Sequence, residues 1–144
     1  MYVLDTNVLV AALWSRKGAS FKVIEHALDG TLRYAVSVAL ALEYEAVLKR
    51  AAMREASWAS LAELELLLDA LLGQARQIMP IRTKLRPALS DPADEMVLEC
   101  AVQAGADAIV TMNVRDFTSA RALYRVDAIQ PGQLLARLKH GDTK

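Results

Sequence analysis

Four acidic residues stand where the sequence pattern leads us to expect apolar or turn residues. Asp5 separates two apolar segments in YVLDTNVLVAAL, and Asp94 falls inside the apolar stripe of a predicted helix over 93–104. Glu43 lies at the edge of another apolar stripe, and Asp116 follows a predicted strand in the turn NVRDF. A carboxylate removed from water is costly unless it is paired or binds a metal. These four acids are therefore candidates for one cation site.

Taken alone, each acid also has a structural explanation. An acid in the first turn of a helix is favoured by the helix dipole, which accounts for Asp94. Glu43 alone fits a surface side chain beside an apolar face, and Asp116 alone fits ordinary turn chemistry. Asp91 is different, because Asp91-Pro92 is typical of an N-cap followed by proline at the first helical position. A shared site requires the fold to bring the acids together.

Strands and helices alternate along the predicted chain. The expected strands cover 2–5, 32–37, 77–81, 107–111 and 124–129. The first helix is expected to begin at Thr6 or Asn7. Further helices are expected over 21–29, with Ser20 as the N-cap, and over 38–54, 58–76, 93–104 and 131–139. Such alternation favours a three-layer α/β/α sandwich with a mostly parallel central sheet.

Ligands of parallel sheets bind at the carboxyl ends of strands, where the strand order reverses. Asp5 and Asp116 follow strands at that edge, while Glu43 comes soon after the second strand. Asp94 opens the helix that leads into the strand over 107–111. Carboxylates brought that close repel one another unless a cation intervenes. Oxygen ligands without His or Cys favour Mg²⁺ or Mn²⁺, which promote phosphodiester cleavage by activating water.

Composition limits the classes of protein that the chain could represent. Its 144 residues suit a single domain over 1–144, and 54% hydrophobic residues exclude a disordered segment. Lys and Arg number 17, as do Asp and Glu, so any nucleic-acid surface must come from locally segregated charge. Neither a secretory signal nor a membrane span is recognisable, and the lone Cys100 allows a reducing compartment. We therefore expect a cytoplasmic protein.

The acidic stretches also carry a family resemblance. LDTNVLVAAL at 4–13, SVALALEYEAVLKR at 37–50, DEMVLECAVQAGADAIVT at 94–111 and NVRDF at 113–117 follow one another in the order found in PIN domains. Within that family the chain resembles the VapC-like ribonuclease toxins of toxin–antitoxin pairs. The resemblance implies a metal-dependent endoribonuclease that uses Mg²⁺ or Mn²⁺, acts on RNA and is inhibited by a cognate antitoxin.

The resemblance also assigns roles to individual residues. Asp5, Glu43 and Asp94 match the three main metal-binding acids. Supporting roles fall to Thr6 or Asn7 near the metal or a phosphate, and to the hydroxyl of Thr111. Many relatives carry a fourth acid where this chain has Asn113, an amide that can bind a cation only through its carbonyl oxygen. Asp116 is expected to take over that position.

Binding of RNA would require basic residues near the acids. The candidates are Arg16, Lys17, Arg82, Lys84, Arg86 and Arg115. For most of them, a solvated surface charge is the simpler interpretation. The run from Arg82 to Arg86 is the best candidate because it leads into the helix of Asp94.

The predicted helix over 58–76 is more apolar than one buried face requires. Leu66 and Leu67 lie outside the stripe formed by Leu61, Leu64, Leu68, Leu71 and Leu72. Either the helix is buried on two sides or it offers a surface to a partner. Together with the resemblance, the second interpretation predicts a homodimer.

Three other functions remain open. A haloacid-dehalogenase-type phosphotransferase also starts from an Asp at a strand end, but requires a second Asp where this chain has Asn7. A catalytically inactive binding module would explain Asn113 as the mark of a lost site. A nuclease acting on DNA is the third, since metal chemistry on a phosphodiester does not read the sugar.

Overall fold

The computed structural model describes residues 1–53, 57–78, 91–119 and 124–140. Five three-residue strands are β1 (Tyr2–Leu4), β2 (Ala35–Ser37), β3 (Arg76–Ile78), β4 (Ala108–Val110) and β5 (Asp127–Ile129). The helices are α1 (Thr6–Trp14), α2 (Ala19–Asp29), α3 (Val38–Met53), α4 (Leu61–Gln74), α5 (Pro92–Ala104) and α7 (Pro131–Lys139), with a 3₁₀ helix η1 over Val114–Phe117. The strand and helix positions follow the alternation predicted from the sequence.

The strands form two parallel sheets, β1-β4-β5 and β2-β3, which lie edge to edge in the order β3-β2-β1-β4-β5. Ladders join β1 to β4, β4 to β5 and β2 to β3, all in parallel. A single parallel bridge between Tyr2 and Tyr34 connects β1 to the β2 segment, and the N–H of Tyr2 donates to the carbonyl of Arg33 at 2.9 Å. The predicted parallel α/β fold is therefore confirmed.

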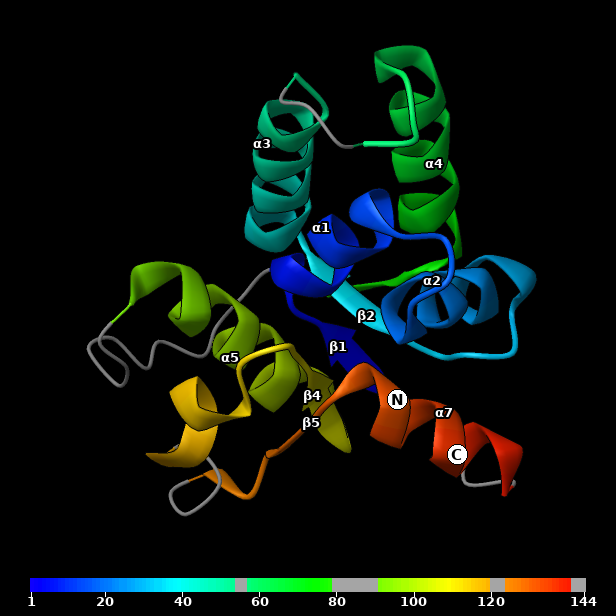
Figure 1. The fold of residues 1–144 in the computed structure, drawn as a ribbon. Coiled ribbons are helices and arrows are strands. Elements are labelled where there is room, and N and C mark those ends of the chain that lie inside the picture. Colours follow the sequence, from blue (N-terminus) through cyan, green and yellow to red (C-terminus); the bar gives the residue numbers. More distant parts are fainter. Residues whose placement is uncertain (54–56, 79–90, 120–123, 141–144) are drawn as a thin grey trace.

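Helices lie on both sides of this sheet (Figure 1). On one side α5 contacts β1, β2, β3 and β4, while on the other α2 packs against α1 and α7. The helices α3 and α4 pack against each other and extend away from the sheet as a pair (Figure 1). The three residues of β1 and of β4 are all buried, because parallel strands covered on both faces have no solvent side.

Several boundaries differ from the predictions for local reasons. Gly18, not Ser20, is the N-cap of α2, and Ser20 is a buried helical residue whose hydroxyl donates to the sulfur of Met112 at 3.5 Å. The fourth helix begins at Leu61 rather than at residue 58, because Ser60 and Glu63 form a reciprocal capping box there. The predicted strand over 77–81 reaches beyond Ile78 into residues outside those described.

The apolar helix α4 is buried along one stripe only. Leu64, Leu68 and Leu71 are buried, as expected. Leu66 is 71% exposed, and Leu61 is 48% exposed although the predicted stripe included it. The correction for Leu61 follows from its place at the first helical position, at the end of the stripe. Two large apolar side chains of this helix therefore face outward. Within the described parts of the chain, no helix is long and apolar enough to cross a membrane.

Candidate metal centre at the carboxyl edge of the sheet

The candidate site lies where the connections of the sheet change direction. From β1 the chain passes toward β2 on one side, whereas from β4 it passes to β5 on the other. The crevice outside the carboxyl ends of two such strands is where ligands bind in open α/β sheets. Asp5 directly follows β1 and Thr111 directly follows β4, so the topology brings these two residues together.

Hydrogen bonds hold the Asp5 carboxylate in place. The Thr111 hydroxyl donates to Asp5 Oδ2 at 2.8 Å, and the Asp5 N–H donates to the carbonyl of Val110 at 2.9 Å. The Thr111 oxygen in turn accepts from the N–H of Asn113 at 3.0 Å and from the side-chain amide of Asn7 at 3.4 Å. Asp5 is 7% exposed and Thr111 is fully buried. The first acid is thus fixed by a polar network between the ends of β1 and β4.

Asn7 completes this network. Its side-chain oxygen accepts from the N–H of Met112 at 3.1 Å while its amide faces Thr111. Both functional groups of Asn7 are therefore engaged in joining α1 to the segment after β4. A phosphotransferase of the haloacid-dehalogenase type would use a carboxylate at this position as its second acid, and here the amide has a structural role.

The polypeptide around Glu43 is tied to the same edge. Tyr44, the next residue on α3, is buried, and its hydroxyl donates to the carbonyl of Leu4, which immediately precedes Asp5. The helix itself starts directly after β2, where the hydroxyl of Ser37 accepts from the N–H of Leu40 at 3.1 Å. Glu43 is half-buried beside these contacts. The Tyr44 contact thus joins this turn of α3 to the end of β1, next to Asp5.

Asp94 occupies the first turn of α5, on the face that the sequence predicted. Val97, Leu98 and Ala101 of that face are buried, and Asp94 itself is half-buried. Asp91 is the N-cap, as predicted, because its carboxylate accepts from the N–H of Ala93 at 2.9 Å. Burial, and after it the charges of Asp5, Asp91 and Asp116, together raise the pKa of Asp94 to about 6.

Burial also raises the pKa of Asp5 above its usual range. The Thr111 hydroxyl and the backbone N–H groups of Thr6 and Asn7 oppose the rise, and the charge of Asp116 adds to it. The charge of Asp116 therefore acts on both Asp5 and Asp94, and the charge of Asp5 acts on Asp94. In this way the structure links three of the four predicted acids, although they come from three different segments of the chain.

Asp116 lies in η1, on the rim of the crevice. It is exposed, as are its neighbours Asn113 and Arg115. A groove of about 490 Å³ is lined by Met112, Asn113, Val114, Arg115, Asp116 and Gln130. Arg115 is thus the predicted RNA-binding residue that the structure places beside an acid of the site.

These acids have the chemistry of a hard-cation site but not yet the geometry of one. Within the part of the chain that the structure describes, no three acidic, His or Cys side chains lie close enough to hold one ion together. The available donors are carboxylate oxygens, and their mutual repulsion is the kind that a divalent cation relieves. Asp5, Glu43, Asp94 and Asp116 fit Mg²⁺ or Mn²⁺ in donor type and would have to draw together around it.

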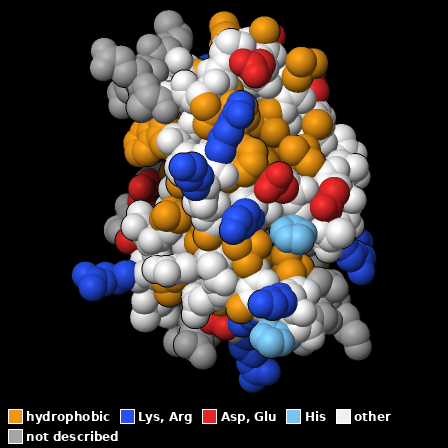
Figure 2. Space-filling view, turned by 45° about the vertical axis from the view of Figure 1, so that its right-hand side comes forward, with side chains coloured by type: hydrophobic (Ala, Val, Ile, Leu, Met, Phe, Trp, Pro, Cys, Tyr) orange, Lys and Arg blue, Asp and Glu red, His pale blue; other side chains and the backbone are white. Residues whose placement is uncertain are grey.

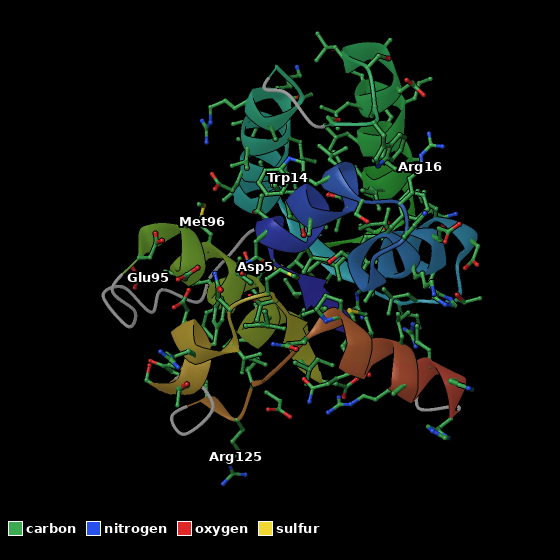
Figure 3. All side chains as sticks on the ribbon, viewed as in Figure 1. Asp5, Trp14, Arg16, Glu95, Met96 and Arg125 are labelled. Atoms are coloured by element: carbon green, nitrogen blue, oxygen red, sulfur yellow. The ribbon has the colours of Figure 1, made fainter. Side chains whose placement is uncertain are left out.

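The other predicted RNA-binding residues lie elsewhere. Arg16 stacks over the ring of Trp58, with its guanidinium carbon 4.3 Å from the ring centroid. Figure 3 shows Arg16 and Asp5 at opposite ends of α1. Lys17 is exposed in the turn after α1. Arg82, Lys84 and Arg86 lie outside the described residues.

Sequence reasoning missed residues of two kinds on the segments that carry the site. Glu95 and Glu99 on α5 are buried, at 3% and 4% exposure, and each has an interaction partner. Their spacing of four residues on one helix was a signal, since residues four apart share a helix face. Gln130 was also missed, although it follows the last strand at the same sheet edge as Asp5.

The sequence profile of the PIN domain family matches residues 1–115 of the chain. The chain belongs to the PIN domain family. The match contains Asp5, Glu43 and Asp94, and Asp116 is the first residue beyond it. No match is found among the curated proteins.

The PIN fold of this chain is also similar to that of a solved structure. The crystal structure of VapBC2 from Rickettsia felis bound to a DNA fragment from their promoter contains a chain that superposes with a TM-score of 0.57. The two sequences are 18% identical, and the similarity covers 90% of this chain and 97% of the other. At that identity the likeness concerns the fold.

Proposed function

We propose that this PIN domain is a metal-dependent endoribonuclease and the toxin component of a toxin–antitoxin pair. The observation that carries the proposal is the group of acids at the crevice between β1 and β4. Burial and three neighbouring carboxylates raise the pKa of Asp94 to about 6, so the site is short of positive charge. A bound Mg²⁺ or Mn²⁺ would supply that charge.

Asp5, Glu43 and Asp94 are the residues that would hold the ion, with Asp116 and Asn113 completing the site. When bound, such an ion makes water more acidic and stabilises negative charge on phosphate oxygens. Thr111 keeps one oxygen of Asp5 engaged, because its hydroxyl donates to Oδ2, and so sets the direction in which the other oxygen points. Arg115, beside Asp116 in the same groove, would bind the phosphate backbone of the substrate.

An RNA-cleavage assay tests the proposal directly. The purified chain is incubated with a pool of single-stranded RNA in Mg²⁺, in Mn²⁺ and in excess chelator, beside the variants Asp5→Asn and Asp94→Asn. We expect cleavage that requires the metal and that both substitutions remove. DNA of the same sequence serves as second substrate, and faster cleavage of DNA would make the protein a deoxyribonuclease. Equal cleavage by wild type and both variants would refute the proposed site.

The proposal includes an antitoxin as protein partner and a cytoplasmic location. Its support is the similarity of the fold to a chain of VapBC2, which was solved as a complex. Co-expression with the product of each flanking gene is the test. We expect the two proteins to co-purify and the RNA-cleaving activity to be suppressed in the complex.

A homodimer is the second assembly that we propose. The outward-facing Leu61 and Leu66 of α4 supply apolar surface that a second copy would cover. Light scattering at micromolar concentration should give twice the 15.8 kDa mass of the chain. The variant Leu66→Glu should shift the mass toward that of one copy, whereas Ala46→Glu, exposed on α3, should not. A single copy for the wild type would contradict the dimer.

Two observations favour a second candidate function, that of a PIN-fold binding module without catalysis. The acids of the described segments do not form a ligand cluster, and residue 113, where the family resemblance leads us to expect a fourth acid, is an amide. Calorimetric titration with Mn²⁺ separates the two functions. A nuclease should bind Mn²⁺ and lose that binding in Asp5→Asn, while an inactive module should bind it poorly in both forms.

A further inference from the structure

A second groove adjoins the one beside Asp116, and it differs in chemistry. Its volume is about 400 Å³, and its lining comes from the end of α1, the start of α2, the segment after β4 and the start of α7. The apolar lining includes Ala11, Ala19, Met112 and Pro131, with Ser15, Ser20 and Gln130 as polar groups. Pockets of this size, mostly apolar with few polar groups, are typical ligand sites.

The two grooves adjoin each other. Met112 and Gln130 line both of them, so these residues stand at the boundary between the groove of Arg115 and Asp116 and the apolar groove. Met112 is 45% exposed and follows Thr111, the residue that donates to Asp5. A polymer whose phosphate lies beside Asp116 would therefore have its adjoining unit beside Met112.

The Met112 side chain is held in this position. Its sulfur accepts a hydrogen bond from Ser20 at 3.5 Å, and its backbone N–H donates to Asn7 at 3.1 Å. Thioethers make favourable contacts with aromatic rings, and a nucleobase presents such a ring. Around it, the hydroxyl of Ser15 and the amide of Gln130 could bond the polar edge of a base.

The charge near the apolar groove favours a nucleic acid over an apolar peptide. Lys17 and Lys22 are exposed and flank the lining segment 18–20. Figure 2 shows Lys and Arg side chains lying among hydrophobic ones on the side of the molecule that carries α2 and α7. Exposed cations beside an apolar groove suit a strand that places a base in the groove and its phosphates along the rim.

We propose that the groove lined by Met112, Ala19 and Pro131 is a nucleobase-binding subsite that holds the base next to the cleaved phosphate of an RNA strand. This inference rests on the proposed nuclease function. It assigns to Met112 a role in substrate specificity, since the groove reads a base while the acids act on the backbone.

The test measures binding of mononucleotides, so it does not depend on cleavage. Protein labelled with ¹³C in the methionine methyl groups is titrated with each of the four ribonucleoside 5′-monophosphates, and with ribose 5-phosphate as the control without a base. The Met112 resonance is assigned from its loss in Met112→Leu. We expect it to shift with at least one nucleotide, whose Kd should be about 5- to 150-fold lower than that of ribose 5-phosphate.

Two glycine variants make a matched pair. A Cβ added at Gly132, which lines the groove, or at Gly73, which lies on α4, would meet no atom within 4 Å. Gly132→Leu should therefore fill the groove and weaken nucleotide binding at least about five-fold, a loss of about 1 kcal/mol. Gly73→Leu should bind like the wild type. If Gly132→Leu melts well below the wild type, Ser15→Leu, at another exposed lining position, replaces it.

Three results would overturn the subsite. They are equal Kd values for nucleotides and ribose 5-phosphate, a Met112 resonance that does not move, and unchanged binding by the groove-filling variant. Loss of antitoxin binding in Gly132→Leu without nucleotide binding in the wild type would instead assign the groove to the protein partner. A wild type that binds nucleotides but cleaves no RNA would refute the nuclease and leave the subsite standing.

Discussion

The two halves of the candidate metal centre are built in different ways. Asp5 is almost completely buried and held by hydrogen bonds between the ends of β1 and β4. Across the crevice, Asp116 is exposed and Asp94 half-buried, and among the described residues no hydrogen bond or ion pair holds either carboxylate. The Asp5 half of the site is therefore preorganised, whereas the carboxylates of Asp94 and Asp116 repel their neighbours and are held by no partner among the described residues.

This contrast assigns different work to the acids. A carboxylate fixed by its neighbours can orient an ion at no further cost, because its geometry is set when the chain folds. Carboxylates that repel one another across solvent are free to move toward a cation, and they gain most from its arrival. Asp5 should therefore determine whether an ion binds productively, and Asp116 should tune how tightly it binds.

The largest expected effect comes from removing the charge of Asp5. If the acid orients the ion, Asp5→Asn should lower the rate of RNA cleavage by about 1,000-fold or more, which corresponds to roughly 4 kcal/mol of transition-state stabilisation. Asp116→Asn should lower it only about 10-fold, since its side chain is exposed on the rim. Single-turnover cleavage of one oligoribonucleotide in Mn²⁺ measures both rates.

Glu45→Gln is the control for this pair. Glu45 is an exposed acid on α3, two residues from Glu43, and its loss should leave the rate unchanged. Equal losses in Asp5→Asn and Asp116→Asn would show that the two halves of the site contribute alike and would end the distinction drawn between them.

The second effect concerns the network that fixes Asp5. Thr111→Val keeps the shape of a fully buried side chain but removes the hydroxyl that serves Asp5 and the N–H of Asn113. We expect a loss of about 1–3 kcal/mol in the free energy of unfolding, because buried polar partners are left unpaired. Cleavage should fall about 10- to 100-fold, as is usual for residues that orient a metal ligand.

Thr118→Val provides the comparison for Thr111→Val. Thr118 is exposed, and its hydroxyl also makes one hydrogen bond, to the carbonyl of Arg115 at 2.9 Å. Urea unfolding should detect less than about 1 kcal/mol of destabilisation there, since the freed carbonyl is solvated. An active Thr111→Val enzyme would mean that Asp5 does not need its hydrogen bond.

The third effect comes from adding an acid to the half of the site that contains Asp116. Asn113→Asp places a carboxylate in the groove of Asp116. Affinity for Mn²⁺ should rise roughly five-fold, equivalent to about 1 kcal/mol for one added charge near the surface. Ser119→Asp adds the same charge on an exposed residue that does not line the groove, and calorimetry should find its affinity unchanged.

Much of the fold could be predicted because residues at the ends of the helices mark those ends locally. Gly30 and Gly105 end α2 and α5 in the left-handed conformation, and Pro131 begins α7. These three helix ends could therefore be predicted. The start of α2 could not be predicted. Ser20 has a side chain suited to an N-cap, but its hydroxyl donates to the sulfur of Met112, which is distant in sequence. Partners set by tertiary structure leave no local signal.

The candidate site was predictable to a similar extent. Burial of the stripe around Asp94 and the place of Asp5 after β1 follow from periodicity and topology. The hydrogen bond from Thr111 to Asp5 joins residues 106 positions apart, and no spacing rule could supply it. The second groove was also hidden, because it forms only where α1, α2 and α7 meet around Met112.

The smallest effect tests the repulsive half through pH. Because the pKa of Asp94 is raised to about 6 in the folded chain, the folded state binds the proton of the Asp94 carboxyl group more tightly than the unfolded state does. Without metal, stability should therefore fall as pH rises from about 4 to 6 and then level off. Asp94→Asn carries no such charge, so its melting temperature should match that of the wild type near pH 4 and exceed it at pH 7.5.

The gain in stability of Asp94→Asn at pH 7.5 should be small, because Asp94 is only half-buried and solvent screens the charges of its neighbours. At most about 1 kcal/mol, or roughly 3 °C, is expected. Asp69→Asn, an exposed acid on α4, should show no such gain. Adding Mn²⁺ should reverse the order, since the ion stabilises the wild type by offsetting the repulsion and finds one ligand fewer in Asp94→Asn. A variant that gains as much from Mn²⁺ as the wild type would separate Asp94 from the ion and leave its raised pKa as a consequence of burial alone.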